Sequence, residues 1–194
     1  KDLSLNDKEE FKDNLKIINN QIKQIEKLVN EFSDFARMPK PIMKKNNLVF
    51  LLNDTINLLR ELDKSIVIKF NNNQDHIELN SDPEQLSRVF FNLIKNSIES
   101  INQKYENSTN FNKKITIELK QVDGHIIVVI EDNGVGFVKL NNNIKEILKP
   151  YFTTKKNGTG LGLSIVNKIV NDHNGNIEFI SIKNGAKIKI NFIK

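Results

Sequence analysis

Apolar residues in the N-terminal part of the chain recur at alternating steps of four and three positions. They stand at Phe11, Leu15, Ile18, Ile22, Ile25, Val29, Phe32 and Ala36. This period of 3.5 residues predicts one long helix whose apolar seam packs against other helices, as in a coiled coil or four-helix bundle. An amphipathic helix lying on its own domain is the alternative. Pro39 and Pro41 end the pattern because neither donates a backbone N–H, so residues 1–38 are expected to form the helix and 39–47 a linker.

Residues 48–194 carry mixed helical and alternating patterns. Asp82-Pro83 followed by Gln85 is typical of a helix start, with Asp as the N-cap and Pro at the first helical position. Helical spacing occurs over 48–62, from 83 onward and over 163–171, and strand patterns over 66–70, 115–120, 126–130, 177–182 and 187–192. The two pairs of later strands turn at Asp123-Gly124 and Asn184-Gly185. A mixed, largely antiparallel sheet with helices indicates an α+β two-layer sandwich.

Composition narrows the chemistry. The 194 residues contain no Cys and three separated His residues, His76, His125 and His173, which excludes disulfide scaffolds, Cys nucleophiles and the usual zinc spacings. Any metal must therefore be held by oxygen, and each His is expected to be structural. No apolar run approaches the roughly 20 residues that cross a bilayer, so neither membrane contact nor a signal peptide is expected in this segment.

The net charge of +5 raises the question of nucleic-acid binding. However, 24 acidic residues are interleaved with 29 basic ones, and Arg, which makes most bidentate contacts to bases and phosphates, is scarce. The sequence therefore predicts no nucleic-acid partner.

A polar stripe follows one face of the helix that begins after Asp82. Asn92, Asn96, Glu99 and Gln103 are spaced by four, three and four residues. An amide oxygen on a rigid helix can help to coordinate Mg²⁺, which prefers oxygen ligands and keeps several waters. The alternative is an ordinary solvated face in a chain rich in Asn.

Asp132 directly follows an apolar strand and precedes Gly134 and Gly136. A carboxylate at a strand end can accept a hydrogen bond from an exocyclic amine such as that of adenine. The two glycines would allow the backbone to approach a flat ring closely. An ordinary Asp/Asn/Gly turn explains the same pattern equally well.

Three glycines stand within five residues before a predicted helix, at Gly158, Gly160 and Gly162. Such a loop lets successive N–H groups converge on an anion, and the helix that follows adds its positive end. Lys155 can supply a point charge for phosphate. The order of residues fits neither the Walker loop nor the dinucleotide fingerprint, so phosphate binding is favoured without a known loop type.

Four stretches together resemble the N, G1, F and G2 boxes of the ATP-binding domain of two-component sensor histidine kinases, within the superfamily that includes gyrase, Hsp90 and MutL. They are 92–100, 132–136, 150–155 and 158–164, in that order. Residues 31–37 resemble the end of the second dimerisation helix in the nitrogen-regulation branch. The resemblance covers nearly the whole chain. It implies the Bergerat ATP-binding fold over 48–194, preceded by one helix of a dimerisation bundle.

The resemblance also implies roles for individual residues. Asn96 would coordinate Mg²⁺, Asp132 would bind the adenine amine, and Gly134 and Gly136 would lie against the ring. Residues 138–149 would be a flexible cover, and Phe152 to Lys155 part of a lid with Lys155 near phosphate. The implied catalytic residues are Asn92, Asn96 and Lys155, and the implied nucleotide-binding residues also include Glu99, Phe152, Thr154, Gly158, Thr159, Gly160, Leu161, Gly162 and Leu163.

Two departures from the family pattern refine the expected function. ATP-hydrolysing members carry a Glu four residues before the magnesium Asn, but this chain has Asn92, whose amide cannot accept a proton at neutral pH. Phosphoryl transfer is therefore favoured over hydrolysis. The phosphoacceptor His of the first dimerisation helix has no counterpart here, so the chain is expected to be a fragment that cannot phosphorylate itself.

The sequence thus predicts a catalytic fragment that binds Mg-ATP and transfers the γ-phosphate to a His on the dimerisation domain. The expected partners are a second copy, through the N-terminal helix, and the receiver domain of a response regulator. A cytoplasmic segment is expected, and whether the parent protein is anchored in the inner membrane is left open. Two alternatives stay open: an ATP-hydrolysing member of the superfamily, and a docking or dimerisation module without kinase activity.

Overall fold

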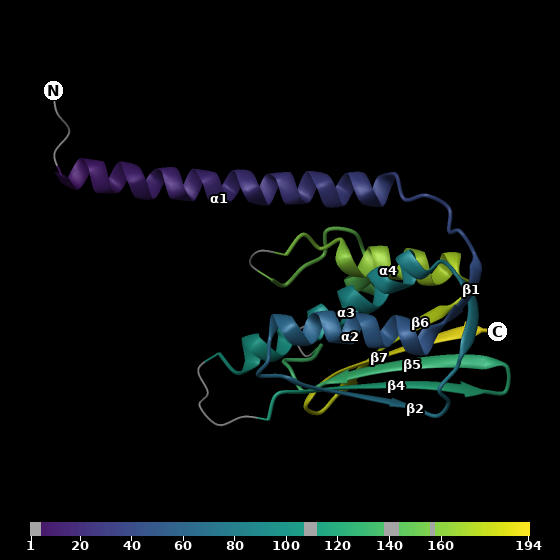
Figure 1. Cartoon of the computed structure of the whole chain (residues 1–194). Helices are drawn as coiled ribbons and strands as arrows, with labels where there is room; N and C mark the ends of the chain where they lie inside the picture. The colour runs from purple at the N-terminus through teal and green to yellow at the C-terminus, as the bar shows by residue number, and fades with distance from the viewer. Residues whose placement is uncertain (1–4, 107–111, 138–143, 156–157) are drawn as a thin grey trace.

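The computed structural model describes residues 5–106, 112–137, 144–155 and 158–194 (Figure 1). Its helices are α1 (Leu5–Ala36), α2 (Leu48–Leu62), α3 (Pro83–Lys104) and α4 (Gly162–Asp172), with a short 3₁₀ helix, η1 (Ile144–Leu148). Its strands are β1 (Lys44–Asn47), β2 (Val67–Asn72), β3 (Glu78–Ser81), β4 (Lys114–Val122), β5 (His125–Asp132), β6 (Asn176–Ile182) and β7 (Gly185–Ile193). The helices and strands predicted from the sequence spacing are all present.

Five strands form one mixed sheet in the order β2-β4-β5-β7-β6. β2 pairs with β4 in parallel, and the other three pairings are antiparallel. Figure 1 shows α2, α3 and α4 together on one face of this sheet, with α3 in contact with both other helices. The predicted α+β two-layer sandwich is therefore confirmed.

The core lies between the helices and the sheet. Alternate residues of β4 and β5 are buried, as expected for strands with one face against helices. The predicted apolar stripe of α3 is buried in full, at Leu86, Val89, Phe90, Leu93, Ile94, Ile98 and Ile101. α3 thus forms the central wall between the sheet and the other two helices.

Asp82 caps α3 as the sequence predicts. Its Oδ1 accepts hydrogen bonds from the N–H groups of Glu84 (3.0 Å) and Gln85 (3.1 Å), and its Oδ2 accepts one from the N–H of Ile42 (2.9 Å). Burial alone would raise the pKa of this carboxyl, but the three N–H donors hold the pKa below its ordinary value. The cap therefore also fixes the segment that follows α1.

One part of the predicted linker is regular structure. Lys44–Asn47 forms strand β1, which pairs antiparallel with β3, from Lys44 opposite Ser81 to Asn47 opposite Glu78. The linker predicted over 39–47 therefore includes a short strand at these four residues. Their sequence is entirely polar, so it carries no alternation that would reveal a strand.

The predicted flexible cover over 138–149 can be assessed only in part. Residues 138–143 lie outside the described residues, whereas Ile144–Leu148 forms η1 and buries Ile147. The second half of the cover is therefore anchored to the core. Leu148 packs against the core beside it.

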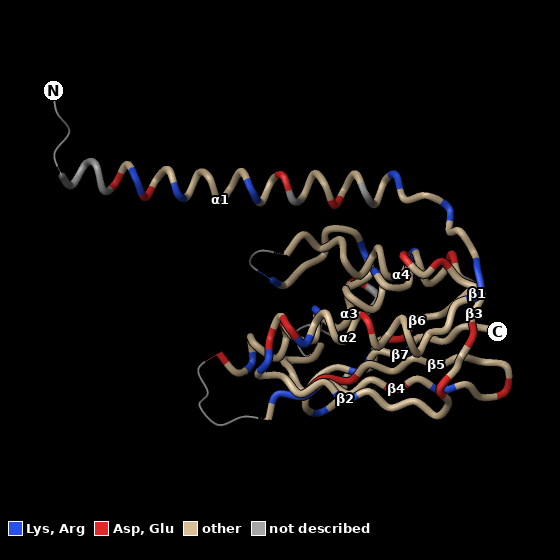
Figure 2. The backbone as a smooth tube through the Cα atoms, viewed as in Figure 1, with Lys and Arg blue, Asp and Glu red and all other residues tan. Residues whose placement is uncertain are grey.

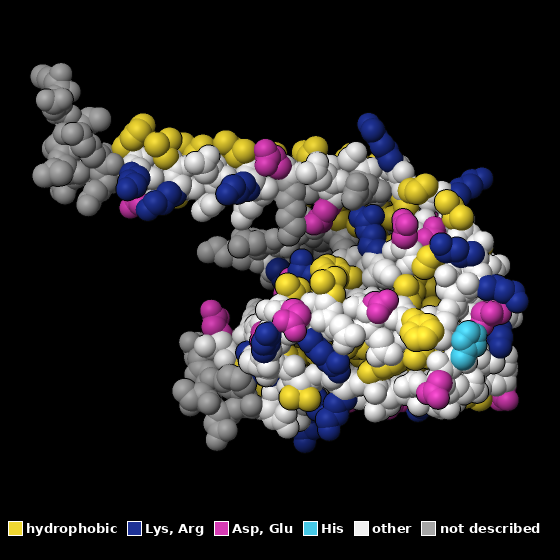
Figure 3. Space-filling model, viewed as in Figure 1, with side chains coloured by type: hydrophobic (Ala, Val, Ile, Leu, Met, Phe, Trp, Pro, Cys, Tyr) yellow, Lys and Arg dark blue, Asp and Glu magenta, His cyan; other side chains and the backbone are white. Residues whose placement is uncertain are grey.

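α1 is a single helix that leaves its apolar seam open to solvent. Figure 1 shows it running beside the domain, with its N-terminal half extending past it. Ile22 is 49% exposed and Val29 58%, and Figure 3 shows a row of apolar side chains along the helix. The predicted long helix is confirmed. None of the helices within the described ranges is long and apolar enough to cross a membrane.

Charged residues of both signs are interspersed along the backbone, including along α1 (Figure 2). Several form pairs between neighbouring strands or helical turns, such as Lys187 with Glu131 (3.0 Å) and Lys168 with Asp172 (2.8 Å). Such exposed pairs contribute little to stability.

Candidate functional site

The polar stripe of α3 meets the end of the predicted lid. Lys155 Nζ donates to Asn96 Oδ1 at 2.7 Å and also pairs with Glu99. Lys155 is 59 positions from Asn96 and 56 positions from Glu99 in the sequence. The stripe is therefore more than a solvated face, because two of its members hold a cation that comes from another segment.

The glycine-rich loop reaches the same helix. A Cβ built on Gly162 would lie 3.7 Å from Asn92 Oδ1, so the first residue of α4 lies beside the start of the stripe. The N-cap of α4 is Leu161, which gives no side-chain hydrogen bond to the free N–H groups of the first turn. Uncapped N–H groups at a helix N-terminus suit a phosphate ligand.

Leu161 and Leu163 differ from the other predicted residues of this loop. Leu161 is fully buried and Leu163 packs against the core, so their side chains anchor α4. Of Leu161, the backbone alone remains available to a ligand. The sequence analysis did not distinguish such anchoring residues from binding residues, although their apolar side chains indicate a packing role.

The glycine-rich loop also packs against the lid. Gly160 has φ +71°, and a Cβ on it would lie 2.4 Å from the Tyr151 carbonyl carbon and 2.7 Å from the Phe152 backbone nitrogen. Only glycine fits such an approach between two backbones without a shift. Gly158 is likewise close to the Thr153 hydroxyl, whereas Thr154 is exposed. The lid and the loop thus form one unit.

Asp132 lies at the end of β5 and is only 5% exposed. Its Oδ2 accepts a hydrogen bond from Ser97 Oγ at 2.9 Å, and its Oδ1 accepts one from the Gly134 N–H at 2.9 Å. Burial raises the pKa of the Asp132 carboxyl, although Gly134, Ser97, the Ala186 N–H and the Lys104 charge all act in the opposite direction. Sequence reasoning missed Ser97, whose signal is a polar residue on the apolar face of α3.

Gly134 and Gly136 have packing roles in this structure. A Cβ on Gly134 would lie 2.8 Å from the Ile101 backbone nitrogen of α3, and a Cβ on Gly136 would lie 2.3 Å from the Gly185 oxygen. The loop after β5 can therefore sit directly on α3 and on the β6–β7 turn. Their expected place against an adenine ring stays a prediction.

The stretches that the sequence singled out thus all adjoin α3. Asn92, Asn96 and Glu99 lie on it, Lys155 and Gly162 contact its polar stripe, and Asp132 bonds to Ser97 of the same helix. A carboxylate acceptor, an amide oxygen, a lysine ammonium and the N-terminus of α4 therefore all adjoin one helix. This set of groups can bind a phosphorylated ligand with an exocyclic amine.

The chain is similar to a family of known proteins over more than half of its length. The profile of the histidine kinase-, DNA gyrase B- and HSP90-like ATPases matches residues 81–193. The chain belongs to this family.

The relatives of the chain include sensor kinases. A putative sensor histidine kinase, NtrY-like, from Rickettsia felis is 35% identical over 97% of this chain. The chain spans about 30% of the length of that relative. The solved catalytic domain of histidine kinase ThkA superposes on 78% of this chain and 95% of its own length, with 28% identity and a TM-score of 0.67.

A second solved structure also covers α1. Histidine kinase ThkA in complex with the response regulator protein TrrA matches 100% of this chain and 53% of its own chain, with a TM-score of 0.72 and 21% identity. At that identity the likeness shows the fold. A long helix ahead of the ATPase domain is therefore part of a known arrangement.

The family's metal chemistry can be tested against the residues present. Asn96 offers an amide oxygen and Glu99 a carboxylate, and both are ligands of the kind that Mg²⁺ prefers. Within the residues that the structure describes, no cluster of three or more His, Cys, Asp or Glu could hold a metal ion. Mg²⁺ bound with a nucleotide keeps waters and phosphate oxygens, so one or two side chains fit it. In this structure the Asn96 oxygen already accepts a hydrogen bond from the ammonium of Lys155.

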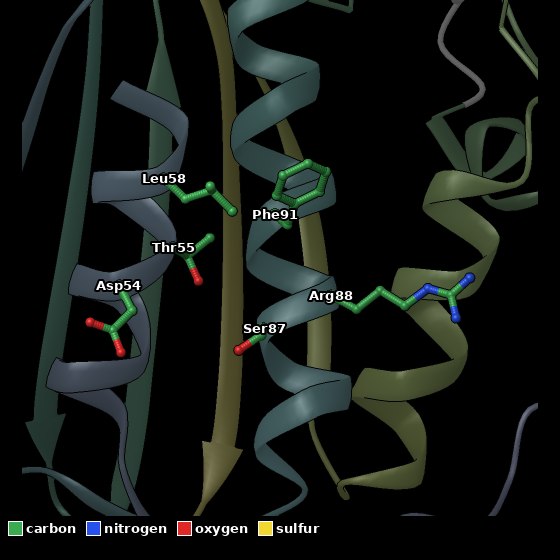
Figure 4. A pocket seen from close by; sticks show the side chains of 6 residues that line it. All are labelled: Asp54, Thr55, Leu58, Ser87, Arg88 and Phe91. Atoms are coloured by element: carbon green, nitrogen blue, oxygen red, sulfur yellow. The ribbon is translucent and has the colours of Figure 1, made fainter. Parts of the chain in front are cut away.

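A shallow hollow of about 370 Å³ lies elsewhere, between α2 and α3 (Figure 4). Its lining contains none of the residues that the family pattern singles out, and consists of Asp54, Thr55, Leu58, Ser87, Arg88 and Phe91. The hollow is thus a surface separate from the candidate site.

His173 has a structural position, as the sequence predicts. Its Nε2 accepts a hydrogen bond from the Asp82 N–H at 2.9 Å, and its Nδ1 lies 2.8 Å from the Ile169 carbonyl oxygen. A carbonyl can only accept, so Nδ1 donates to it, while Nε2 is the acceptor of the Asp82 N–H. The imidazole ties the end of α4 to the start of α3 and has no nitrogen left for a phosphoryl group.

Proposed function

We propose that this chain binds ATP with Mg²⁺ and is the catalytic part of a sensor histidine kinase that transfers the γ-phosphate to a His on a dimerisation domain. The observation that supports this most is that α3 is in contact with all parts of the candidate site. Lys155 bonds to Asn96 of α3, the N-terminus of α4 lies beside Asn92 of α3, and Asp132 bonds to Ser97 of α3. The 35% identity to an NtrY-like sensor kinase supports the same class.

Each group then has a distinct task. The Asp132 carboxylate accepts a hydrogen bond from the adenine amine, and the N–H groups of the glycine-rich loop and of the first turn of α4 bind the phosphates. Asn96 contributes an oxygen ligand to Mg²⁺, which neutralises phosphate charge when bound. Lys155 moves from Asn96 to the phosphate and adds a second positive charge.

Transfer is favoured over hydrolysis because Asn92 stands where a water-activating carboxylate would be needed. An amide does not accept a proton at neutral pH, so an attacking water has no base at this position. Phosphoryl transfer to a stronger nucleophile needs mainly positioning and charge neutralisation. A His imidazole is such a nucleophile.

The rest of the proposal concerns partners. Residues 1–38 belong to a dimerisation bundle, 39–47 connect it to the nucleotide-binding domain at 48–194, and a second copy covers the seam of α1. A response regulator receives the phosphoryl group, as the name of the ThkA complex with TrrA suggests by analogy. ATP supply and such a partner are both consistent with a cytoplasmic location for this segment.

Nucleotide binding is tested by calorimetry with ADP and Mg²⁺. The wild type should bind, and Asp132→Asn should weaken binding about ten- to a hundredfold, because it replaces an ionised acceptor by an amide. Asp54→Asn is the matched control, since this exposed carboxylate lies in the hollow between α2 and α3. No binding by the wild type, or an equal loss in both variants, would contradict the proposal.

Phosphoryl transfer is tested with γ-labelled ATP. The chain alone should not become labelled, whereas a separately added dimerisation domain that carries the acceptor His should acquire acid-labile phosphate. Steady release of free phosphate without labelling of that domain would instead favour the ATP-hydrolysing alternative.

A further inference from the structure

Ser97 is a polar residue on the buried face of α3. It is 2% exposed, and its neighbours on that face are Leu93, Ile94 and Ile101, each fully buried. A hydroxyl in the middle of a helix commonly bonds back to the carbonyl four residues earlier. Ser97 Oγ instead donates to Asp132 Oδ2 at 2.9 Å, across to the end of β5. This bond joins two positions that are 35 residues apart.

Ser97 Oγ donates to Oδ2 of the Asp132 carboxylate, and the Gly134 N–H donates to Oδ1 at 2.9 Å. With Ser97 on one oxygen, Gly134 on the other and the Ala186 N–H of β7 as a further donor, the plane of the carboxylate has a fixed direction. The Gly134 donor lies on the same loop as Asp132, so it moves with that loop. Ser97 is the donor that comes from the rigid helix and fixes the carboxylate relative to the Asn96 side of the site.

We propose that Ser97 is a positioning residue for adenine recognition, which acts through the hydrogen bond from its hydroxyl to the Asp132 carboxylate. This inference rests on the proposed function, because it assumes that Asp132 accepts the adenine amine. It extends that function to base selectivity. The preference for a base that carries the amine depends on how well Ser97 orients the Asp132 carboxylate that accepts it.

The hydroxyl also favours the ionised form of Asp132. Burial raises the pKa of the Asp132 carboxyl, the Gly134, Ser97 and Ala186 donors oppose that rise, and the charge of Lys104 at the end of α3 opposes it as well. Loss of the Ser97 donor therefore raises this pKa further. A protonated carboxyl becomes a donor at one oxygen, so it loses part of its capacity to accept the amine.

Ser100 gives a matched control one turn along the same helix. Its Oγ accepts a hydrogen bond from the Val135 N–H at 3.0 Å, so it holds the backbone of the same loop. Ser97 thus holds the carboxylate and Ser100 holds the main chain. Removing either hydroxyl loosens the loop, but of the two only the removal of Ser97 takes a donor away from the Asp132 carboxylate.

The test compares the affinity for ADP with that for the same diphosphate carrying unsubstituted purine, which lacks the amine. The wild type should prefer ADP by about tenfold or more, and Ser97→Ala should lower this preference about fivefold. Ser97→Thr, which keeps the hydroxyl, should restore the preference. Ser100→Ala should weaken both ligands alike and keep the preference. Ser97→Cys introduces a weaker donor of similar size, so it should also lower the preference for ADP. This variant tests the inference even if Ser97→Ala does not fold.

Two outcomes would overturn the inference in different ways. Equal weakening of both ligands by Ser97→Ala, with the preference unchanged, would show a purely structural role for Ser97 and leave the proposed function intact. Failure of the wild type to bind either ligand would overturn the proposed function and this inference with it.

A carboxyl titration followed by NMR without nucleotide should also show a higher Asp132 pKa in Ser97→Ala than in Ser100→Ala, and equal values would contradict the inference.

Discussion

α1 and α3 carry apolar stripes of similar regularity, yet the protein covers only one of them. On α3, Phe90, Leu93 and Ile101 are fully buried between the sheet and the neighbouring helices. On α1, Ile22 and Val29 are about half exposed. The comparison shows that helical periodicity identifies the face of a helix that needs a partner, but not where that partner comes from.

The physical difference lies in what surrounds each helix. Burial of one large apolar side chain contributes roughly 1.5–3 kcal/mol, and α3 gains this several times over within its own domain. α1 contacts the rest of the protein near its C-terminal end, where Phe32 stacks on Tyr151 at 6.5 Å between ring centroids and Thr159 of the glycine-rich loop donates to Glu31. Its exposed seam gains such energy when another helix covers it.

The largest expected effect belongs to the covered helix. Phe90→Ala should lower the free energy of unfolding by about 3–5 kcal/mol, because it removes a fully buried ring and leaves a cavity beside the sheet. Urea unfolding at a low protein concentration measures this. A loss below about 1 kcal/mol would mean that α3 is not the central wall of the core.

The N-cap of α3 should give an intermediate effect. Asp82→Ala removes acceptors for the N–H groups of Glu84, Gln85 and Ile42 and should cost about 1–2 kcal/mol at neutral pH. Because the folded protein lowers the pKa of Asp82, this stabilisation is complete above pH about 4. It should disappear as the pH falls through the lowered pKa.

Urea unfolding of the wild type and Asp82→Ala over a range of pH values tests this dependence. Asp54→Ala, at an exposed position on α2, should stay within about 0.5 kcal/mol of the wild type. A difference for Asp82→Ala that does not shrink at low pH would show that its cause is not the ionised cap.

The smallest effect on domain stability is expected in the open seam. Ile22→Ala should change the free energy of unfolding of the nucleotide-binding domain by less than about 0.5 kcal/mol, because Ile22 is 49% exposed. The same variant should weaken self-association in sedimentation experiments, since the seam is the proposed dimer contact. If Ile22→Ala destabilised the domain and left association unchanged, the contrast between the two helices would fail.

Much of the fold follows from local patterns in the sequence. The Asp82-Pro83 start predicts α3, and the apolar run over 126–130 with the Asp123-Gly124 turn predicts β5 and the β4–β5 hairpin, because local chemistry determines these features. β1 could not be predicted from its own residues. Lys44–Asn47 is polar and becomes a strand through pairing with β3, which is a tertiary interaction.

The site shows the same limit. The residue types at Asn96, Asp132 and Gly160 indicate the chemistry, but spacing does not reveal that Lys155 lies on Asn96 or that Ser97 bonds to Asp132. Leu161 matched the binding loop by sequence although its side chain belongs to the core. Such partners depend on how distant segments pack, and that information is absent from a one-dimensional pattern.

The central claim is that distant stretches of the chain bind one nucleotide together around α3. An NMR titration of backbone amides with ADP and Mg²⁺ tests it most directly. The account predicts that the amides of Asn96, Gly134 and Gly162 shift together with one dissociation constant, while that of Ile22 stays unchanged. Shifts confined to the hollow around Arg88, or to one of the three stretches, would contradict it.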